Sequence, residues 1–212
     1  KSITLSKPNN NKAWTHRNGD MQHSIGHPDL RKDFQVIWSS KIGAGNTRKT
    51  RITADPIIAN NTIFVMDSKS RVSGFSLEGS LIWSKSLVPD KEHANDASGG
   101  GLAFSGGMVY AVTGFGDVFC LNAKTGTLNW KRRLGSPITA APAVDKKFIY
   151  LVTRDNSAWA LNSSTGDIEW FRNGSPSNST IVGGAGPAVT GRLVIIPSSS
   201  GELVVAIKDS GL

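Results

Sequence analysis

Three of the four histidines lie in one short N-terminal stretch, where their imidazoles could bind a metal ion. His16, His23 and His27 are interspersed with Asp20 and followed by Asp29, and imidazole and carboxylate groups at short spacing are ligands that zinc accepts. The stretch has no strand or helix pattern that would hold these side chains rigidly. A solvated tail is therefore the favoured interpretation, and we expect no metal site.

Other residue types that carry chemistry occur in patterns that fit turns better than catalysis. Cys120 is the single cysteine, which excludes an intramolecular disulfide and a cysteine zinc cluster. The glycine run at 99–101 lacks the Lys-Ser/Thr that follows a phosphate-binding loop, and no serine stands in a Gly-x-Ser-x-Gly elbow. Asp117, Asp155 and Glu202 recur in successive repeats and are interpreted as turn residues. We therefore expect no catalytic residues and no bound cofactor.

The charge distribution argues against nucleic-acid binding, and the hydropathy argues against a membrane span. Lys and Arg outnumber Asp and Glu by 24 to 16, giving a net charge of +8, but the basic residues are scattered apart from short runs at 48–51 and 131–133. No stacking aromatics are interleaved with these runs, so nucleic-acid binding is not expected. No stretch approaches the roughly 18 to 20 apolar residues of a membrane span, and residues 1–12 contain no apolar signal core.

An internal repeat organises the rest of the chain. Trp38, Trp83, Trp130 and Trp170 are separated by 45, 47 and 40 residues, and each follows a short β-rich segment. Repeats of this length are typical of β-propeller blades, each of which contributes one four-stranded antiparallel sheet. The interpretation is an all-β fold with roughly four blades.

Each repeat contains an apolar run at the same place. The runs at 62–66, 108–112, 148–152 and 192–196 have about five residues each and are bounded by turn residues, which predicts strands buried on both faces, as in sheets stacked between neighbours. The expected organisation is a flexible N-terminal segment over 1–33 and a partial propeller over 34–212. Its parts are a lead-in strand at 34–43 and repeats at about 54–87, 100–134, 140–173 and 185–212.

A glycine turn precedes the tryptophan at a fixed offset in two of the repeats. Gly126 stands four residues before Trp130, and Gly166 four residues before Trp170, so that the glycine can adopt a positive φ where the chain reverses. An indole that lies across the neighbouring blade buries roughly 150 to 250 Å². The residues expected to dock one blade on the next are Trp38, Trp83, Trp130, Trp170, Gly126 and Gly166.

Residues 120–130 and 160–170 share the pattern Leu-Asn-x-x-Thr-Gly-x-x-x-Trp, which resembles the tryptophan-docking repeat of the quinoprotein, or PQQ-like, β-propeller superfamily. Within it, Ala13-Trp14, the stretch 37–43 and the stretch 184–205 resemble the BamB family of outer-membrane assembly lipoproteins in its alphaproteobacterial form. Members of that family close eight blades into a ring. The resemblance thus implies half of a propeller, either a truncated or cleaved piece or one of two half-rings that associate through their open blade faces.

The resemblance to the BamB family also implies a function. It is that of a non-catalytic periplasmic scaffold, anchored to the inner leaflet of the outer membrane by a lipidated cysteine upstream of this chain. Its implied partners are a POTRA domain of the barrel protein BamA and other subunits of the assembly machinery, with unfolded outer-membrane proteins as further candidates. The implied contact residues are Ser179, Thr180, Ile181, Val182 and Gly183, where Ile181 and Val182 match the position of the family's leucine-arginine pair.

Two alternatives stay open beside the scaffold. One is a fragment of a dehydrogenase that uses pyrroloquinoline quinone and calcium, although the adjacent cysteine pair and the calcium-binding acids of such enzymes are not visible here. The other is the sensor or interaction domain of a different envelope protein.

Overall fold

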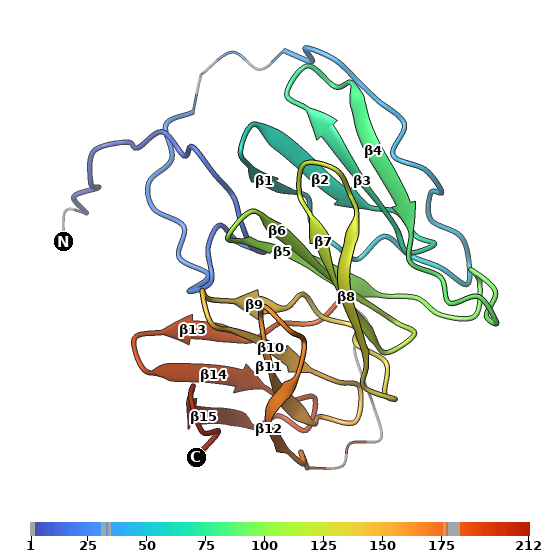
Figure 1. Ribbon diagram of the computed structural model, residues 1–212. Coiled ribbons are helices and arrows are strands. Elements are labelled where there is room, and N and C mark those ends of the chain that lie inside the picture. The colour runs from blue at the N-terminus through green and yellow to red at the C-terminus, as the bar shows by residue number, and fades with distance from the viewer. Residues whose placement is uncertain (1–2, 31–32, 34, 176, 178–182) are drawn as a thin grey trace.

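The computed structural model describes all residues except 1–2, 31–32, 34, 176 and 178–182. The described residues form fifteen β-strands in four antiparallel sheets, with no helix among them (Figure 1). The predicted all-β propeller fold is confirmed. Consequently, the described part of the chain has no helix long and apolar enough to cross a membrane.

The four sheets, or blades, follow one another along the chain. Within each sheet the strands are ordered as in the sequence and joined by short turns. The first blade comprises β1 (Ile57–Ala59), β2 (Thr62–Met66), β3 (Arg71–Ser76) and β4 (Leu81–Ser86). The second comprises β5 (Gly100–Ser105), β6 (Met108–Thr113), β7 (Asp117–Asn122) and β8 (Leu128–Arg133). The third comprises β9 (Ala143–Val144), β10 (Phe148–Val152), β11 (Ala158–Asn162) and β12 (Ile168–Arg172). The fourth comprises β13 (Ala188–Thr190), β14 (Leu193–Pro197) and β15 (Leu203–Ile207).

The central strands of the second and third blades are buried on both faces because each of these blades packs between two others. In β6, Val109 and Ala111 join the apolar core shared with the first blade, whereas Tyr110 and Val112 join the core shared with the third. Side chains of a strand alternate between its two faces, so burial of both faces requires a continuous apolar run. This packing explains the apolar runs of the second and third repeats, whereas the fourth repeat buries Val194 and Ile196 on one face of β14 and leaves Leu193 exposed.

Each docking tryptophan lies on the turn between the last two strands of the following blade. Trp83 donates from Nε1 to the Ala123 carbonyl at 2.8 Å, and a Cβ built on Gly126 would stand 2.5 Å from its ring. Trp130 meets the third blade in the same way, since its Nε1 lies 3.1 Å from the Ser163 carbonyl and its ring covers Gly166. The glycines are needed both for their positive φ and because the indole occupies the space of a side chain.

The segment before the first blade differs from the sequence-based expectation. The described residues 35–43 contain no strand, so the prediction of a lead-in strand at 34–43 is wrong for that part of the chain. Trp38 nevertheless docks on the first blade, with Nε1 donating to the Leu77 carbonyl at 2.8 Å and its ring against Gly79. The Ser40 hydroxyl also donates to the Gly79 carbonyl at 2.6 Å, so side-chain contacts hold this segment without ladder pairing.

The structure of the N-terminal segment also differs from the prediction. It was expected to be a flexible tail, yet residues 14–21, which we call the strap, are bonded to the blades. Trp14 forms an isolated antiparallel bridge with Ile58 of β1, and His16 is almost fully buried. In Figure 1 this blue segment reaches the blades near β5 and β9. The strap thus belongs to the packed body of the protein.

Candidate partner-binding site

The loop between the third and fourth blades is the place where sequence analysis expects a partner. Ser179, Thr180, Ile181 and Val182 lie outside the described residues, whereas Gly183 is described. Its N–H donates to the Thr139 carbonyl at 2.9 Å, and its φ of 78° is one that glycine adopts without strain. The backbone that follows the loop is therefore anchored to the third blade.

Arg17 of the strap holds the same backbone from the other side. Its Nη1 donates to the carbonyls of Gly183 at 2.8 Å and Gly184 at 2.7 Å, and its Nε lies 3.0 Å from Asp55 Oδ2. Asp55 precedes the first blade, whereas Gly184 precedes the fourth. One guanidinium therefore connects the segments that lead into the first and fourth blades. It can do so because its N–H donors lie in one plane and point in several directions.

Replacing Arg17 by alanine is expected to lower the free energy of unfolding by about 1 to 2 kcal/mol, because two carbonyls and one carboxylate lose a charged donor. Arg17→Lys should recover less than half of this loss, since one ammonium cannot reproduce the fork. The measurement is urea unfolding followed by circular dichroism. Arg51→Ala, at an exposed arginine, is the matched control, and an equal loss in that variant would contradict the role of Arg17.

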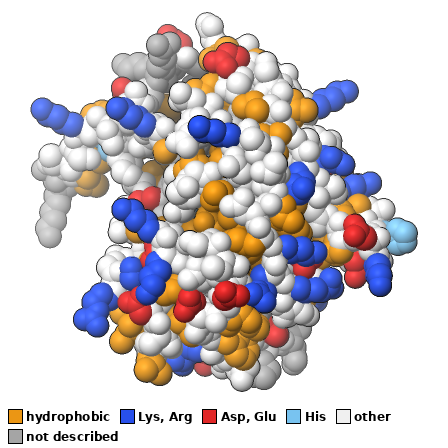
Figure 2. All heavy atoms as spheres, viewed as in Figure 1, with side chains coloured by type: hydrophobic (Ala, Val, Ile, Leu, Met, Phe, Trp, Pro, Cys, Tyr) orange, Lys and Arg blue, Asp and Glu red, His pale blue; other side chains and the backbone are white. Residues whose placement is uncertain are grey.

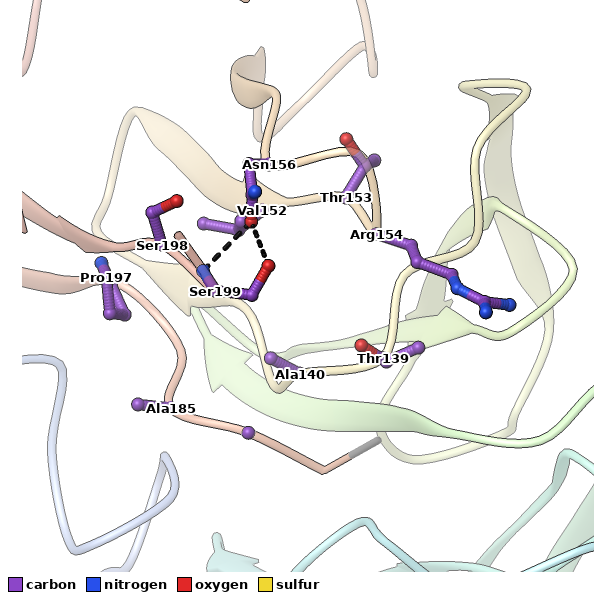
Figure 3. A pocket seen from close by; sticks show the side chains of 11 residues that line it. Thr139, Ala140, Val152, Thr153, Arg154, Asn156, Ala185, Pro197, Ser198 and Ser199 are labelled. Atoms are coloured by element: carbon purple, nitrogen blue, oxygen red, sulfur yellow. Dashed lines mark hydrogen bonds between the residues drawn. The ribbon is translucent and has the colours of Figure 1, made fainter. Parts of the chain in front are cut away.

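A pocket of about 220 Å³ opens between the third and fourth blades, beside the anchored backbone (Figure 3). Its walls combine apolar surface from Val152 and Pro197 with hydroxyls of Thr139, Ser198 and Ser199. In Figure 3 the Arg154 side chain extends away from Asn156 and Ser199. Such a surface offers hydrogen bonds around a small apolar floor, which suits protein contacts as well as small polar ligands.

Asn156 organises the polar side of this pocket. Its Oδ1 accepts from the N–H of Ser199 at 2.9 Å and from the Ser199 hydroxyl at 2.7 Å, while its Nδ2 donates to the Ser175 carbonyl at 2.8 Å. The residue has a positive φ of 63°, which asparagine tolerates better than most residues. Asn156 thus ties the turn between β14 and β15 to the beginning of the loop that precedes the fourth blade.

The reactive side chains of the described residues are used structurally. Burial raises the pKa of the Cys120 thiol to about 11, so it is not a nucleophile near neutral pH. Asp117, expected in a turn, is instead the first residue of β7, and its fully buried carboxylate lies 3.1 Å from Lys131 Nζ. Among the described residues no three His, Cys, Asp or Glu side chains are grouped as a metal site would require.

The N-terminal histidines occupy separate environments. His16 Nε2 lies 3.0 Å from the Val144 nitrogen and Nδ1 lies 2.8 Å from Thr15 Oγ1, whereas His27 Nδ1 bonds the Ser6 carbonyl at the exposed surface. Burial lowers the pKa of His16 to about 4, and the positive charge of His23 acts in the same direction. His16 is therefore neutral at physiological pH, and the interpretation of this histidine as part of a solvated tail is wrong.

Figure 2 shows Lys and Arg side chains spread over one face of the molecule and interspersed with acidic ones. Arg132 of β8, for instance, donates from Nη2 to Asp167 at 2.6 Å in the next blade. This distribution agrees with the absence of basic stripes in the sequence.

Comparison with known proteins then decides the family. The family model described as outer membrane protein assembly factor BamB matches residues 68–211, which is more than half of the chain. The chain belongs to the BamB family. The matched residues include β3 through β15 and the tryptophan docks between the blades.

Among curated proteins, BamB of Escherichia coli is 28% identical over 125 residues, covering 55% of this chain and 31% of that protein. BamB of Xanthomonas campestris is 27% identical over 121 residues, with 54% and 29% covered. The chain thus spans about a third of the length of the curated BamB relatives that it matches. Among solved structures, BamB from Moraxella catarrhalis aligns with a TM-score of 0.55 and 20% identity, over 70% of this chain and 46% of that one.

The same fold occurs in a quinohemoprotein alcohol dehydrogenase from Pseudomonas putida HK5. That structure aligns with a TM-score of 0.75 over 94% of this chain and 39% of its own, at 18% identity. At this identity the likeness is one of fold only. It shows that the stacked blades are those of the PQQ-like propellers.

Sequence analysis missed two classes of residue. Gly79 and Gly211 lie under Trp38 and Trp170 as Gly126 and Gly166 lie under the other indoles. The signal for Gly79 is its place four residues before Trp83, and the signal for Gly211 is its distance of 41 residues from Trp170, which equals the distance from Trp38 to Gly79. His16 and Arg17 were missed for a different reason. Their partners are mostly backbone groups far along the chain, which leave no pattern in the sequence.

Proposed function

We propose that this chain is the propeller part of a non-catalytic scaffold in outer-membrane protein assembly. In this proposal it acts in the periplasm, tethered to the inner leaflet of the outer membrane, and binds BamA through a POTRA domain. The observation that supports it is the match to the BamB family over residues 68–211, where the blades are clamped to one another by docked indoles. A rigid stack of this kind presents inter-blade loops in fixed positions, and loops on rigid scaffolds usually carry binding.

The loop before the fourth blade is the proposed contact. Ile181 and Val182 are adjacent apolar residues in an otherwise polar stretch rich in serine and asparagine. Such apolar residues at a protein interface act as anchors that are removed from water on binding. The backbone after them is fixed by Arg17 and Thr139, and the pocket with Asn156 lies beside it. The partner is expected to cover both.

Replacing Ile181 and Val182 together by aspartate is expected to weaken the affinity for BamA by about tenfold or more, because two apolar anchors become charges that must be desolvated. The unfolding midpoint should stay unchanged. Affinity is measured by surface plasmon resonance with the periplasmic part of BamA, and stability by thermal unfolding followed by circular dichroism.

A matched control places the same charges elsewhere on the propeller. Leu81 and Ile82 are adjacent, apolar and half exposed on the outer strand β4. Their replacement by aspartate should leave BamA affinity within about twofold of the parent. Equal affinities for all three proteins would exclude the loop as the contact, and no measurable binding by any of them would exclude BamA as the partner.

A further inference from the structure

The inner strands β1, β5, β9 and β13 stand at one end of their sheets, so each has a neighbouring strand on one side only. The other side of such an edge strand presents unpaired N–H and C=O groups, which readily bond an extended chain. In this protein the strap runs past these edges. The four inner edges together form a surface that we call the inner track.

Backbone bonds hold the strap to the first two blades. The N–H of Trp14 donates to the Ile58 carbonyl at 2.7 Å and the N–H of Ile58 donates back at 2.8 Å. One residue further, the Thr15 carbonyl accepts from the N–H of Phe104 in β5 at 2.8 Å. These bonds depend on the extended backbone of the strap and not on its side chains, as in strand addition to a sheet edge.

Further contacts continue along the third and fourth blades. Val144 of β9 donates its N–H to His16 Nε2 at 3.0 Å, and Val189 of β13 donates its N–H to the Met21 carbonyl at 2.8 Å. Between them the chain turns at Asn18 and Gly19, which both have positive φ. The strap therefore contacts the inner strand of each of the four described blades within eight residues, 14 to 21.

Two side chains of the strap supply selectivity. The third position, His16, places Nε2 at a buried site 3.0 Å from the nitrogen and 3.1 Å from the oxygen of Val144, and the fourth, Arg17, places a guanidinium between Asp55 and the carbonyls of Gly183 and Gly184. A residue without an acceptor would leave the Val144 N–H unpaired, which is costly in a buried site. The inner track therefore distinguishes segments by the side chains at these two positions.

The strap does not fill the space beside the track. A hollow of about 570 Å³ lies between the strap and the second and third blades, with largely apolar walls that include Met21, Phe104 and Val144. Lys146 and Asp145 stand at its side.

We propose that the inner track is a peptide-binding site and that residues 14–21 of this chain are its built-in ligand. The site takes a segment that offers main-chain groups at its first two positions and then turns back on itself, with an imidazole at the third position and a guanidinium at the fourth. The strap is held by the same strand-edge bonds that a separate peptide would use. This site is independent of the proposed contact with BamA.

The first test cuts the covalent connection of the strap in the full chain. A protease recognition sequence is inserted after Leu30, which is exposed, and the purified protein is cleaved there. The fragment that carries the strap is expected to stay with the blades in gel filtration through the micromolar range. Its separation from the blades after cleavage, whether they stay folded or not, would overturn the proposal.

The second test measures exchange with a labelled synthetic peptide of residues 12–26. The peptide is expected to replace the cleaved fragment in a saturable manner, followed by fluorescence anisotropy. Peptides with His16→Ala or Arg17→Ala should compete about tenfold less well, whereas Gln22→Ala, at an exposed side chain, should compete like the parent. Equal competition by all four peptides would show that binding to the inner track does not depend on His16 or Arg17, and would overturn the proposal.

Discussion

Replacing Trp83 by alanine is expected to lower the free energy of unfolding by about 3 to 5 kcal/mol, the range found when a large buried aromatic is removed from a core. The Trp83 side chain is 8% exposed, packs on Phe64 at a centroid distance of 5.9 Å and bonds the Ala123 carbonyl. Its removal leaves a cavity between the first and second blades and an unpaired carbonyl. The loss is measured by urea unfolding followed by circular dichroism.

A glycine substitution tests the same dock from the other side. Gly126→Ala places a methyl group 2.5 Å from the Trp83 ring at a φ of 70°, so both the clash and the backbone strain oppose folding. Gly135→Ala is the matched control, because Gly135 has a φ of 80° and nothing within 4 Å of its added Cβ. The control should lose about 1 kcal/mol from strain alone, and Gly126→Ala should lose clearly more.

The two substitutions should also be coupled. Once Trp83 is alanine, the added methyl group at Gly126 meets an empty space, so Gly126→Ala should then cost about as little as Gly135→Ala. A strictly additive double variant would show that the indole and the glycine do not act as one dock. A loss below about 1 kcal/mol in Trp83→Ala would show that the indole does not hold the blades together.

The repeat structure could be predicted because its physical cause is local in the sequence. Burial on both faces demands apolar runs such as Phe148–Val152, and a ring lying on a turn demands glycine at a fixed offset, as at Gly166. Both requirements recur once per blade, so repetition separates them from chance. The same repetition identifies Gly211 beneath Trp170 in the last blade, although no tryptophan follows it in the chain.

The strap could not be predicted because its contacts are non-local and use backbone groups. Nothing near Trp14 or Thr15 in the sequence indicates that their partners are Ile58 and Phe104. The prediction of a lead-in strand was wrong for a related reason. Its apolar residues Val36 and Ile37 resemble a strand but are about 90% exposed, and the segment is bound to the first blade by the side chains of Trp38 and Ser40.

Burial of one histidine makes the stability of the strap depend on pH. His16 is 3% exposed, and its Nε2 lies 3.0 Å from the Val144 nitrogen and 3.1 Å from the Val144 oxygen, so it accepts the N–H in one tautomer and donates to the carbonyl in the other. Burial lowers the pKa of His16 from 6.5 to about 4 in the folded state. Between these two values the unfolded chain binds more protons than the folded one, so the stability contributed by His16 is complete above about pH 6.5 and is lost as the pH falls toward about 4. Other charged groups around this site are Arg17, Asp20, His23, Asp145, Lys146, Lys147 and Lys208.

The wild-type chain is therefore expected to lose about 2 to 3 kcal/mol more than His16→Gln when the pH is lowered from about 7 to about 4.5. Glutamine keeps an acceptor for the Val144 N–H but does not titrate, and the remaining carboxylates and histidines contribute equally to both proteins. Urea unfolding at a series of pH values gives the difference. A pH dependence that is identical in the two proteins would mean that His16 is not desolvated, and the strap would then have to leave the blades reversibly near neutral pH.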